Sequence, residues 1–212
     1  IINGGEHADN NIDIQEFMIM PLGASSFSEG MQWSTEIYAG LKKLLQQQNL
    51  STGVGDEGGF APNLKSHQEA IELIIQAIEN NNLTPGADVS IALDCAATEF
   101  YDDCLYHLKG EPFKLNAHEF SEYLESLCSK YPIVSTEDGM DESDYEGWKI
   151  LTNALGKKCQ LVGDDLFVTN AAELQKGIDE SLGNSILIKF NQIGTITETM
   201  HTIHLANLNN FT

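Results

Sequence analysis

Short apolar runs alternate with longer amphipathic segments from about Val89 to the end of the chain. The apolar runs cover residues 89–93, 133–135, 160–162 and 186–188. Each run is short and rich in branched side chains, as is typical of strands buried on both faces. The intervening segments begin at Asn116, Asn170 and Thr195, each followed three residues later by Glu, which is a helix-start pattern. Strands alternating with helices predict an α/β fold with a parallel sheet.

Two further helices are predicted before the first of these runs. Residues 27–48 place Leu41, Leu44 and Leu45 on one face, and Ser66 opens a second apolar-periodic stretch that ends near residue 80. A dinucleotide-binding fold is disfavoured because no G-x-G-x-x-G follows a strand. A (β/α) barrel fits better, but a complete barrel takes about 250 residues. The chain has 212 residues, so we expect an incomplete barrel.

The charge balance excludes some classes of partner. The formal net charge is −21, with 11 Lys and Arg against 32 Asp and Glu. Nucleic acid and anionic membranes are therefore not expected as main partners, since both need basic residues. No segment is long and apolar enough to span a membrane. The 4 cysteines lie far apart and form no C-x-x-C pair, so we expect free thiols and a cytoplasmic location.

An ionisable residue stands at the end of each predicted strand. These residues are Asp94, Glu137, Asp164 and Lys189. The carboxyl ends of barrel strands meet on one face, where active sites are built. Three carboxylates in one place need a neutralising charge, and Mg²⁺ is a cation that takes a few carboxylates as ligands. Such a cation, with burial, would lower the pKa of Lys189 and make it a general base.

Each of these residues taken alone has a simpler interpretation. A single carboxylate after a strand is more often a helix cap or a solvated loop residue, and a single lysine is usually exposed. The simpler interpretation requires a separate coincidence at every strand. Asp138 and Asp165 adjoin the candidate ligands and remain open as alternatives to Glu137 and Asp164.

A glycine-rich loop, VGDEGGFAPN at residues 54–63, carries two adjacent carboxylates, Asp56 and Glu57. Glycines let the backbone adopt positive φ angles or approach a ligand closely. A phosphate would be repelled by the two acids. The loop is therefore either a solvated turn or a holder of a proton or a cation.

Several segments together resemble the enolase family. They are INGGEHADN at 2–10, QEFM at 15–18, VGDEGGFAPN at 54–63, IALD at 91–94, YPIVSTED at 131–138 and LIKFNQIGT at 187–195. They occur in the family's order and extend over nearly the whole chain. The resemblance implies a glycolytic lyase that uses Mg²⁺ to interconvert 2-phospho-D-glycerate and phosphoenolpyruvate. It also implies a barrel that opens with two strands and two helices before the βα repeats.

The resemblance assigns roles to individual residues. The ligands of Mg²⁺ would be Asp94, Glu137 and Asp164. Lys189 would remove the C2 proton of the substrate, and Glu57, supported by Glu16, would be the acid that helps the C3 hydroxyl to leave. His7 and Gln15 would line the substrate pocket, which Glu16 and Lys189 would also face. Metal ions where charge develops, with an acid for a poor leaving group, suit this elimination.

The resemblance is incomplete at both ends. Enolases carry an N-terminal domain with a mobile loop, and they continue into a segment that binds the substrate phosphate and carboxylate. Neither has a counterpart here, so we expect residues 1–212 to be part of the catalytic barrel domain and to be inactive alone. The parent protein is expected to be an active homo-oligomer, a dimer or larger.

Three other functions compete with this hypothesis. A mandelate-racemase-like relative would also abstract a proton α to a carboxylate, but the loop at 54–63 and the His7 segment favour enolase. A binding or scaffold protein would use the carboxylates only structurally and would tolerate the loss of Lys189. A glycosidase would use paired carboxylates and would have no need of Lys189 at the next strand end.

Overall fold

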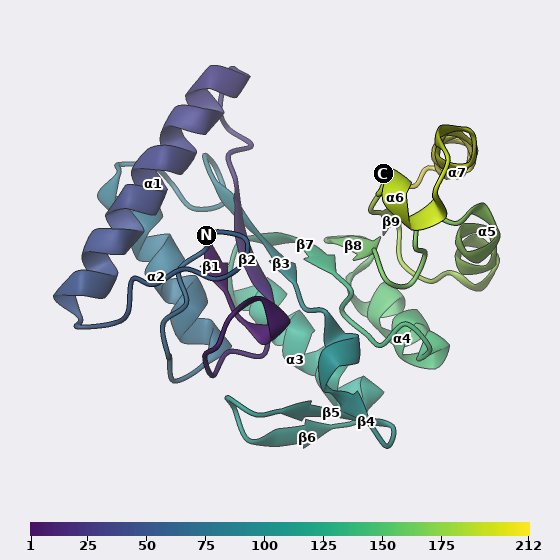
Figure 1. Cartoon of the computed structure of the whole chain (residues 1–212), viewed down its shortest axis with the longest axis horizontal. Coiled ribbons are helices and arrows are strands. Elements are labelled where there is room, and N and C mark those ends of the chain that lie inside the picture. The colour runs from purple at the N-terminus through teal and green to yellow at the C-terminus, as the bar shows by residue number, and fades with distance from the viewer. The chain divides into compact units, whose positions relative to one another are not determined.

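The computed structural model describes residues 1–212, and Figure 1 labels their helices and strands. These residues form two compact units. The first unit consists of Ile1–Asp94, His107–Phe113 and Leu127–Val134. The second unit consists of Cys95–Tyr106, Lys114–Ser126 and Ser135–Thr212.

The strands of the first unit are antiparallel to one another. They are β1 (Ile2–Asn3), β2 (Glu16–Met20) and β3 (Ser90–Asp94). In the register, Phe17 lies opposite both Ile2 and Leu93, and Glu16 lies opposite Asp94. Every residue of β3 is buried, as its continuous apolar run predicts. The carboxylates of Glu16 and Asp94 therefore stand at the same end of two paired strands.

Two helices of the first unit pack against each other (Figure 1). They are α1 (Phe27–Gln47) and α2 (His67–Asn80). The side chains of Ser26 and Ser66 cap them by accepting the N–H groups of Glu29 and Glu69. Both helices end within one residue of their predicted bounds. The predicted opening of two strands followed by two helices is confirmed.

The second unit contains the predicted parallel repeats. Their order is β7 (Ile133–Glu137, in this unit from Ser135), α4 (Tyr145–Leu155), β8 (Gln160–Gly163), α5 (Ala171–Glu180) and β9 (Ser185–Ile186). Thr136 pairs with Leu161, and Val162 pairs with Ser185, both in parallel register. The helices α6 (Phe190–Ile193) and α7 (Ile196–Leu208) follow. The α/β fold class is confirmed.

The last strand is shorter than predicted. The apolar run at 186–188 predicts a strand up to Lys189, but β9 ends at Ile186. The backbone N–H of Leu187 still donates to the carbonyl of Gly163 at 3.1 Å, so the chain stays beside β8 for one more residue. Lys189 then becomes the residue that precedes α6.

All three helix starts in this part of the chain are confirmed. Asn116 accepts from the N–H groups of His118 and Glu119 before α3 (Ala117–Lys130). Asn170 accepts from Ala172 before α5, and Thr195 accepts from Glu198 before α7. These short side-chain caps depend on local sequence, which is why the pattern locates them well.

A small sheet was not predicted. It is formed by β4 (Tyr101–Asp102), β5 (Leu105–Leu108) and β6 (Phe113–Leu115). The turn between β4 and β5 has φ angles of 51° at Asp103 and 60° at Cys104. Hairpin turns with two positive φ angles usually carry Asn-Gly or Asp-Gly, so Asp-Cys gives no turn signal.

Close packing positions β8 against α5 in the second unit. A Cβ atom at Gly163 would lie 2.6 Å from the ring of Phe167, and a Cβ at Gly177 would overlap the same ring. Phe167 is fully buried. The two glycines thus let an aromatic ring fill the space between strand end and helix, directly beside Asp164.

Candidate active site

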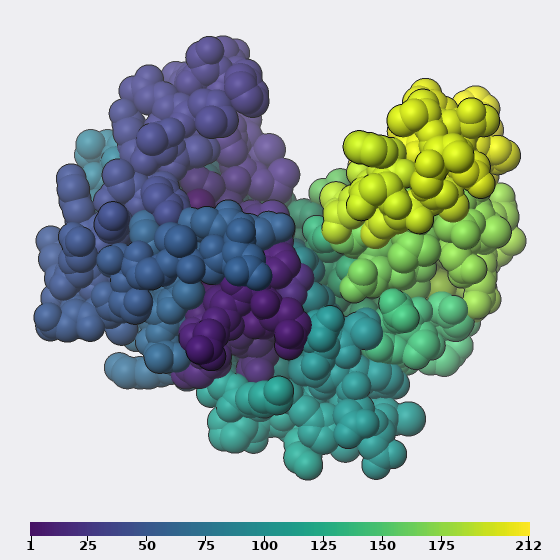
Figure 2. Space-filling view, viewed as in Figure 1, coloured from purple at the N-terminus to yellow at the C-terminus, as the bar shows by residue number.

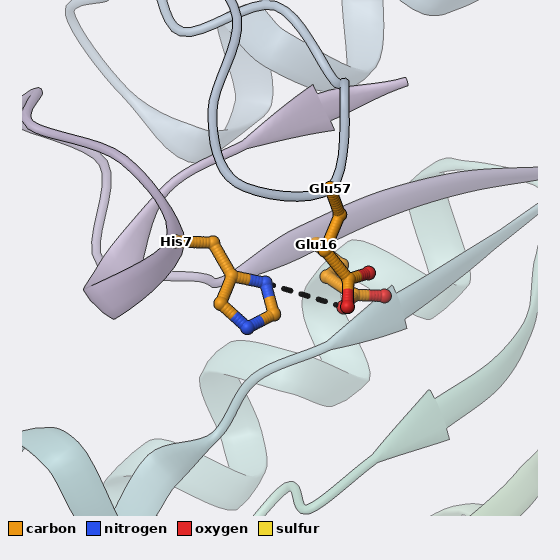
Figure 3. Close-up of side chains that lie close together, drawn as sticks. All are labelled: His7, Glu16 and Glu57. Carbon is orange, nitrogen blue, oxygen red and sulfur yellow. Dashed lines mark ion pairs between the residues drawn. The ribbon is translucent and has the colours of Figure 1, made fainter.

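Three ionisable side chains of the first unit converge (Figure 3). His7 ends a short 3-10 helix, Glu16 begins β2, and Glu57 lies on the loop at 54–63. One nitrogen or oxygen atom from each lies within 4.8 Å of the other two. Nδ1 of His7 is 3.3 Å from Oε1 of Glu16, although the atom is buried and has no partner in hydrogen-bond geometry. His7 therefore keeps a buried nitrogen free to bind a polar group.

The loop that bears Glu57 lies against the N-terminal segment (Figure 2), and backbone hydrogen bonds join the two. The backbone N–H of Asp56 donates to the carbonyl of His7 at 2.9 Å, and that of Gly59 donates to Oδ1 of Asn3 at 2.9 Å. A Cβ at Gly59 would lie 2.7 Å from the same Asn3 oxygen. Gly58 has a φ of 83° at the tip of the loop. The glycines thus serve close backbone approach, and Glu57 is held in place.

The surroundings of Glu16 favour its protonated form. Burial raises the pKa of Glu16 to about 8, and the side-chain hydrogen bond with Glu57 and the charge of Asp94 add to the effect. Glu57 itself is exposed. A half-buried carboxyl that keeps its proton at neutral pH can supply that proton to a group bound at the loop.

Gln15 and Asp94 lie together in the first unit. Nε2 of Gln15 donates to Oδ2 of Asp94 at 3.2 Å, and the backbone N–H of Gln15 donates to the carbonyl of Asp94 at 3.0 Å. Asp94 is 6% exposed. The structure thus brings a predicted substrate-binding residue onto a predicted metal ligand.

Glu137, Asp164 and Lys189 all belong to the second unit. Glu137 ends β7, Asp164 follows β8, and Lys189 precedes α6. Nζ of Lys189 forms an ion pair with Oδ2 of Asp164. The lysine side chain is 46% exposed, whereas that of Asp164 is 9% exposed. The amine thus reaches a buried carboxylate from a position open to solvent.

Asp138 binds the backbone directly after β8. Its two carboxylate oxygens accept the backbone N–H groups of Asp164 at 3.1 Å and of Asp165 at 2.9 Å. It is 3% exposed and has a φ of 40°, an uncommon angle for a residue other than glycine. Its two oxygens accept backbone N–H groups, so Asp138 helps to hold Asp164 and Asp165 in position.

The pKa of Lys189 differs from the expectation. Burial lowers it, but the hydrogen bond that Nζ donates to Asp164 and the charges of Asp164, Glu137 and Asp165 outweigh burial and raise the pKa above its usual value. The protein groups by themselves therefore do not produce the predicted lowering, which stays a prediction for the site with its cation. The expectation assumed a neighbouring cation, whereas carboxylates stabilise the ammonium.

Two residues of the second unit were missed by the sequence analysis. Nε2 of Gln192 donates to Oδ1 of Asp164 at 2.7 Å, and Oγ1 of Thr169 donates to Oε1 of Gln192 at 2.8 Å. Gln192 lies one helical turn after Lys189, a spacing that could have indicated it. Thr169 carries no comparable signal, since only the folded loop brings it to Lys189.

The carboxylates of the second unit fit a hard divalent cation. One oxygen each from Asp138, Asp164 and Asp165 lies within 4.8 Å of the other two. Burial and the charge of Asp164 raise the pKa of Asp165, a sign that like charges crowd here. Oxygen ligands with crowded negative charge suit Mg²⁺ or Ca²⁺ rather than a soft metal.

No helix in residues 1–212 is both long and apolar enough to cross a membrane. No disulfide bond joins any two of the cysteines Cys95, Cys104, Cys128 and Cys159. A comparison with protein families matches residues 1–212 to the family described as "Enolase, C-terminal TIM barrel domain". The match covers the whole chain.

Proposed function

This chain belongs to the enolase family, whose members are carbon–oxygen lyases that interconvert 2-phospho-D-glycerate and phosphoenolpyruvate, and we propose how its residues divide that reaction. Lys189 removes the proton from C2 of 2-phospho-D-glycerate. Glu57, with Glu16, protonates the departing C3 hydroxyl. The observation that carries the proposal is the pairing of an accessible amine with a buried carboxylate, Lys189 with Asp164, at adjacent strand ends.

Lys189 must lose a proton before it can act as the base. Its ammonium is held by Asp164 and by the charges of Glu137 and Asp165, which favour the protonated form. Because nearly half of the side chain is exposed, Nζ can move away from Asp164 without rearrangement of the core. We propose that Nζ of Lys189 leaves these carboxylates when Mg²⁺ and the substrate bind.

Mg²⁺ is the proposed cofactor, held by Asp94, Glu137 and Asp164. When bound, it supplies positive charge where negative charge develops on the substrate carboxylate. Asp94 ends β3, Glu137 ends β7, and Asp164 follows β8, the positions that the family's motifs assign to the ligands. Oxygen-only ligands at buried strand ends support this choice of metal.

Glu16 and Glu57 supply the acid. The raised pKa of Glu16 keeps one proton on the pair at neutral pH. Hydroxide is a poor leaving group, so a proton at the C3 oxygen lowers the barrier to its departure. His7, whose Nδ1 has no hydrogen-bond partner, and Gln15 are proposed to bind the substrate.

The wider setting also follows from the family. We propose that residues 1–212 are part of the catalytic barrel domain of a longer, cytoplasmic, homo-oligomeric enzyme. Four cysteines without a disulfide bond are in keeping with a reducing compartment. The proposed partner is the small anionic substrate, and the net charge of −21 argues against nucleic acid.

The test is Mg²⁺-dependent dehydration of 2-phosphoglycerate by the natural polypeptide that contains this chain, followed by the ultraviolet absorbance of the enol product. Lys189→Ala is compared with Lys157→Ala, which removes an exposed lysine outside the candidate site. We expect wild-type activity that a chelator abolishes. Lys189→Ala should abolish it too, whereas Lys157→Ala should retain it. A folded wild-type protein without activity would refute the proposed function, and an active Lys189→Ala would refute the role of the base.

A further inference from the structure

Four residues of the second unit form a closed ring of hydrogen bonds around Asp164, which we call the Asp164 ring. Its members are Asp164, Thr169, Lys189 and Gln192. Nζ of Lys189 binds Oδ2 of Asp164, and Nε2 of Gln192 donates to Oδ1 at 2.7 Å. Oγ1 of Thr169 donates to Oε1 of Gln192 at 2.8 Å and accepts the backbone N–H of Lys189, also at 2.8 Å.

The donors and acceptors of the ring match without exception. The carboxylate of Asp164 can only accept, so the amide of Gln192 must turn its NH₂ group toward it. Oε1 of Gln192 then faces Thr169, whose single hydroxyl hydrogen it accepts. The hydroxyl oxygen keeps its lone pairs for the N–H of Lys189. The orientation of each group therefore depends on its neighbour in the ring.

Thr169 is held in a demanding conformation. It is fully buried, with a φ of 57°, and Val168 before it has a φ of 41°. Left-handed angles at two consecutive β-branched residues are unusual and persist only where the surroundings impose them. Oγ1 of Thr202 in α7 donates to the carbonyl of Thr169 at 2.8 Å and anchors this turn. The position of the Thr169 hydroxyl is therefore fixed by buried contacts.

We propose that Thr169 and Gln192 are positioning residues that align the proposed metal ligand Asp164 with the proposed base Lys189, an inference that rests on the proposed function. Gln192 occupies Oδ1 of Asp164 and leaves Oδ2 as the oxygen open to a cation or to Nζ. Thr169 fixes the backbone from which the lysine side chain extends. One hydroxyl thereby sets the geometry of both groups.

The experiment uses the natural polypeptide with three substitutions in the ring. Thr169→Val removes the hydroxyl at nearly constant shape, Thr169→Ser retains it, and Gln192→Met removes the amide at similar length. Gln175→Met is the matched control, because Gln175 donates to Asp179 on the exposed face of α5. Calorimetric titration with Mg²⁺ alone gives the affinity, steady-state kinetics with 2-phosphoglycerate give kcat and KM, and thermal melts report stability.

We expect Thr169→Val and Gln192→Met each to weaken Mg²⁺ binding and to lower kcat by about 10- to 100-fold. KM at saturating Mg²⁺ should change much less, since neither Thr169 nor Gln192 is proposed to contact the substrate. Thr169→Ser should restore most of both quantities, and the double variant should lose little more than the worse single variant. Gln175→Met should behave as wild type.

Wild-type Mg²⁺ affinity and kcat in both Thr169→Val and Gln192→Met would overturn the inference. Losses that follow only the melting temperature, without rescue by Thr169→Ser, would also overturn it, because they indicate a merely structural role. A wild-type protein that binds Mg²⁺ but does not turn over refutes the proposed function, and the Mg²⁺ affinities of the variants then decide the inference. A wild-type protein that neither binds Mg²⁺ nor turns over 2-phosphoglycerate refutes both the proposed function and this inference.

Discussion

The backbone N–H of Asp56 donates to the carbonyl of His7 at 2.9 Å, which ties the glycine-rich loop to the segment that carries the histidine. The parallel bridge between Ile2 and Phe60 and the hydrogen bond from Gly59 to Asn3 hold the other end of the loop. Glu57 therefore extends from a loop that is anchored on both sides. Such anchoring is expected of a catalytic acid, whose distance to the substrate must be constant.

Glu57→Gln tests the proposed acid independently of the proposed base, Lys189. If Glu57 protonates the C3 hydroxyl, its loss should slow dehydration by about 10²- to 10⁴-fold, the usual effect of removing a general acid. Exchange of the C2 hydrogen with solvent deuterium should continue, because Lys189 is intact. Both rates can be followed in one sample by nuclear magnetic resonance.

Asp56→Asn is the control for this substitution. Asp56 is exposed and contributes its backbone N–H to the anchoring of the loop, which the substitution preserves. It should leave both rates near wild type. If Glu57→Gln abolished exchange and dehydration equally, the division of roles between Glu57 and Lys189 would be wrong.

Gly59→Ala tests the close approach of the loop. Its Cβ would lie 2.7 Å from Oδ1 of Asn3, whereas a Cβ at Gly53 would meet only Oγ of Ser51, at 3.3 Å. We expect Gly59→Ala to destabilise the fold by about 1–3 kcal/mol, as overpacking usually does, and Gly53→Ala to have a much smaller effect. Denaturant unfolding measures both, and equal effects would contradict the proposed packing.

The half-buried carboxyl of Glu16 makes stability depend on pH. Its folded pKa of about 8 is above the ordinary value of 4.5. Between these two pH values the folded state holds a proton that the unfolded state has lost. Stability should therefore fall as pH rises from about 4.5 and level off above about 8. Glu16→Gln should remove this dependence and be more stable than wild type at pH 9 by about 1–3 kcal/mol.

Chemical unfolding of wild type and Glu16→Gln from pH 5 to pH 9 checks this prediction. His7→Gln, at the neighbour whose Nδ1 lies 3.3 Å from Oε1 of Glu16, serves as the second variant. Parallel stability curves for wild type and Glu16→Gln would show that Glu16 titrates normally and would contradict its raised pKa.

Asp13 should stabilise the fold in the opposite pH range. Burial alone would raise its pKa, but hydrogen bonds to its carboxylate lower the pKa below its usual value. The N–H groups of Lys109 and Gly110 donate to it at 2.9 and 3.0 Å. Nε2 of His67 lies 3.5 Å away but accepts the N–H of Asp13 at 3.1 Å, so we attribute the lowering to the two backbone donors.

This contribution is complete above pH 3.8 and is lost as pH falls through the lowered folded pKa. Asp13→Asn should therefore cost about 1–3 kcal/mol at pH 7 and progressively less below pH 4. Asp9→Asn, at an exposed position, is the control and should show no such trend. A loss that is constant down to pH 2 would contradict the assigned pKa direction.

Local patterns predicted most of the elements. The caps at Ser66, Asn116 and Thr195 and the fully buried β3 follow from short-range rules, because their hydrogen bonds and burial involve neighbouring residues or a continuous apolar run. The positions of Glu137 and Asp164 at strand ends follow from the same alternation.

Contacts between distant segments were beyond such rules. The Asp164 ring depends on two left-handed residues that propensity disfavours, so no sequence pattern predicts the part that Thr169 plays in it. The hairpin at Asp103 and Cys104 lacks the usual turn residues for the same reason. The direction of the Lys189 pKa shift depends on which carboxylates surround the amine, and only the folded chain places them.

The central claim is that Lys189 is the base, and exchange of the C2 hydrogen of 2-phosphoglycerate in deuterium oxide tests it most directly. The wild-type polypeptide and Lys158→Ala, at another exposed lysine, should exchange this hydrogen in the presence of Mg²⁺. Lys189→Ala should exchange it about 10²- to 10⁴-fold more slowly while remaining folded. Exchange at the wild-type rate in Lys189→Ala would contradict the account.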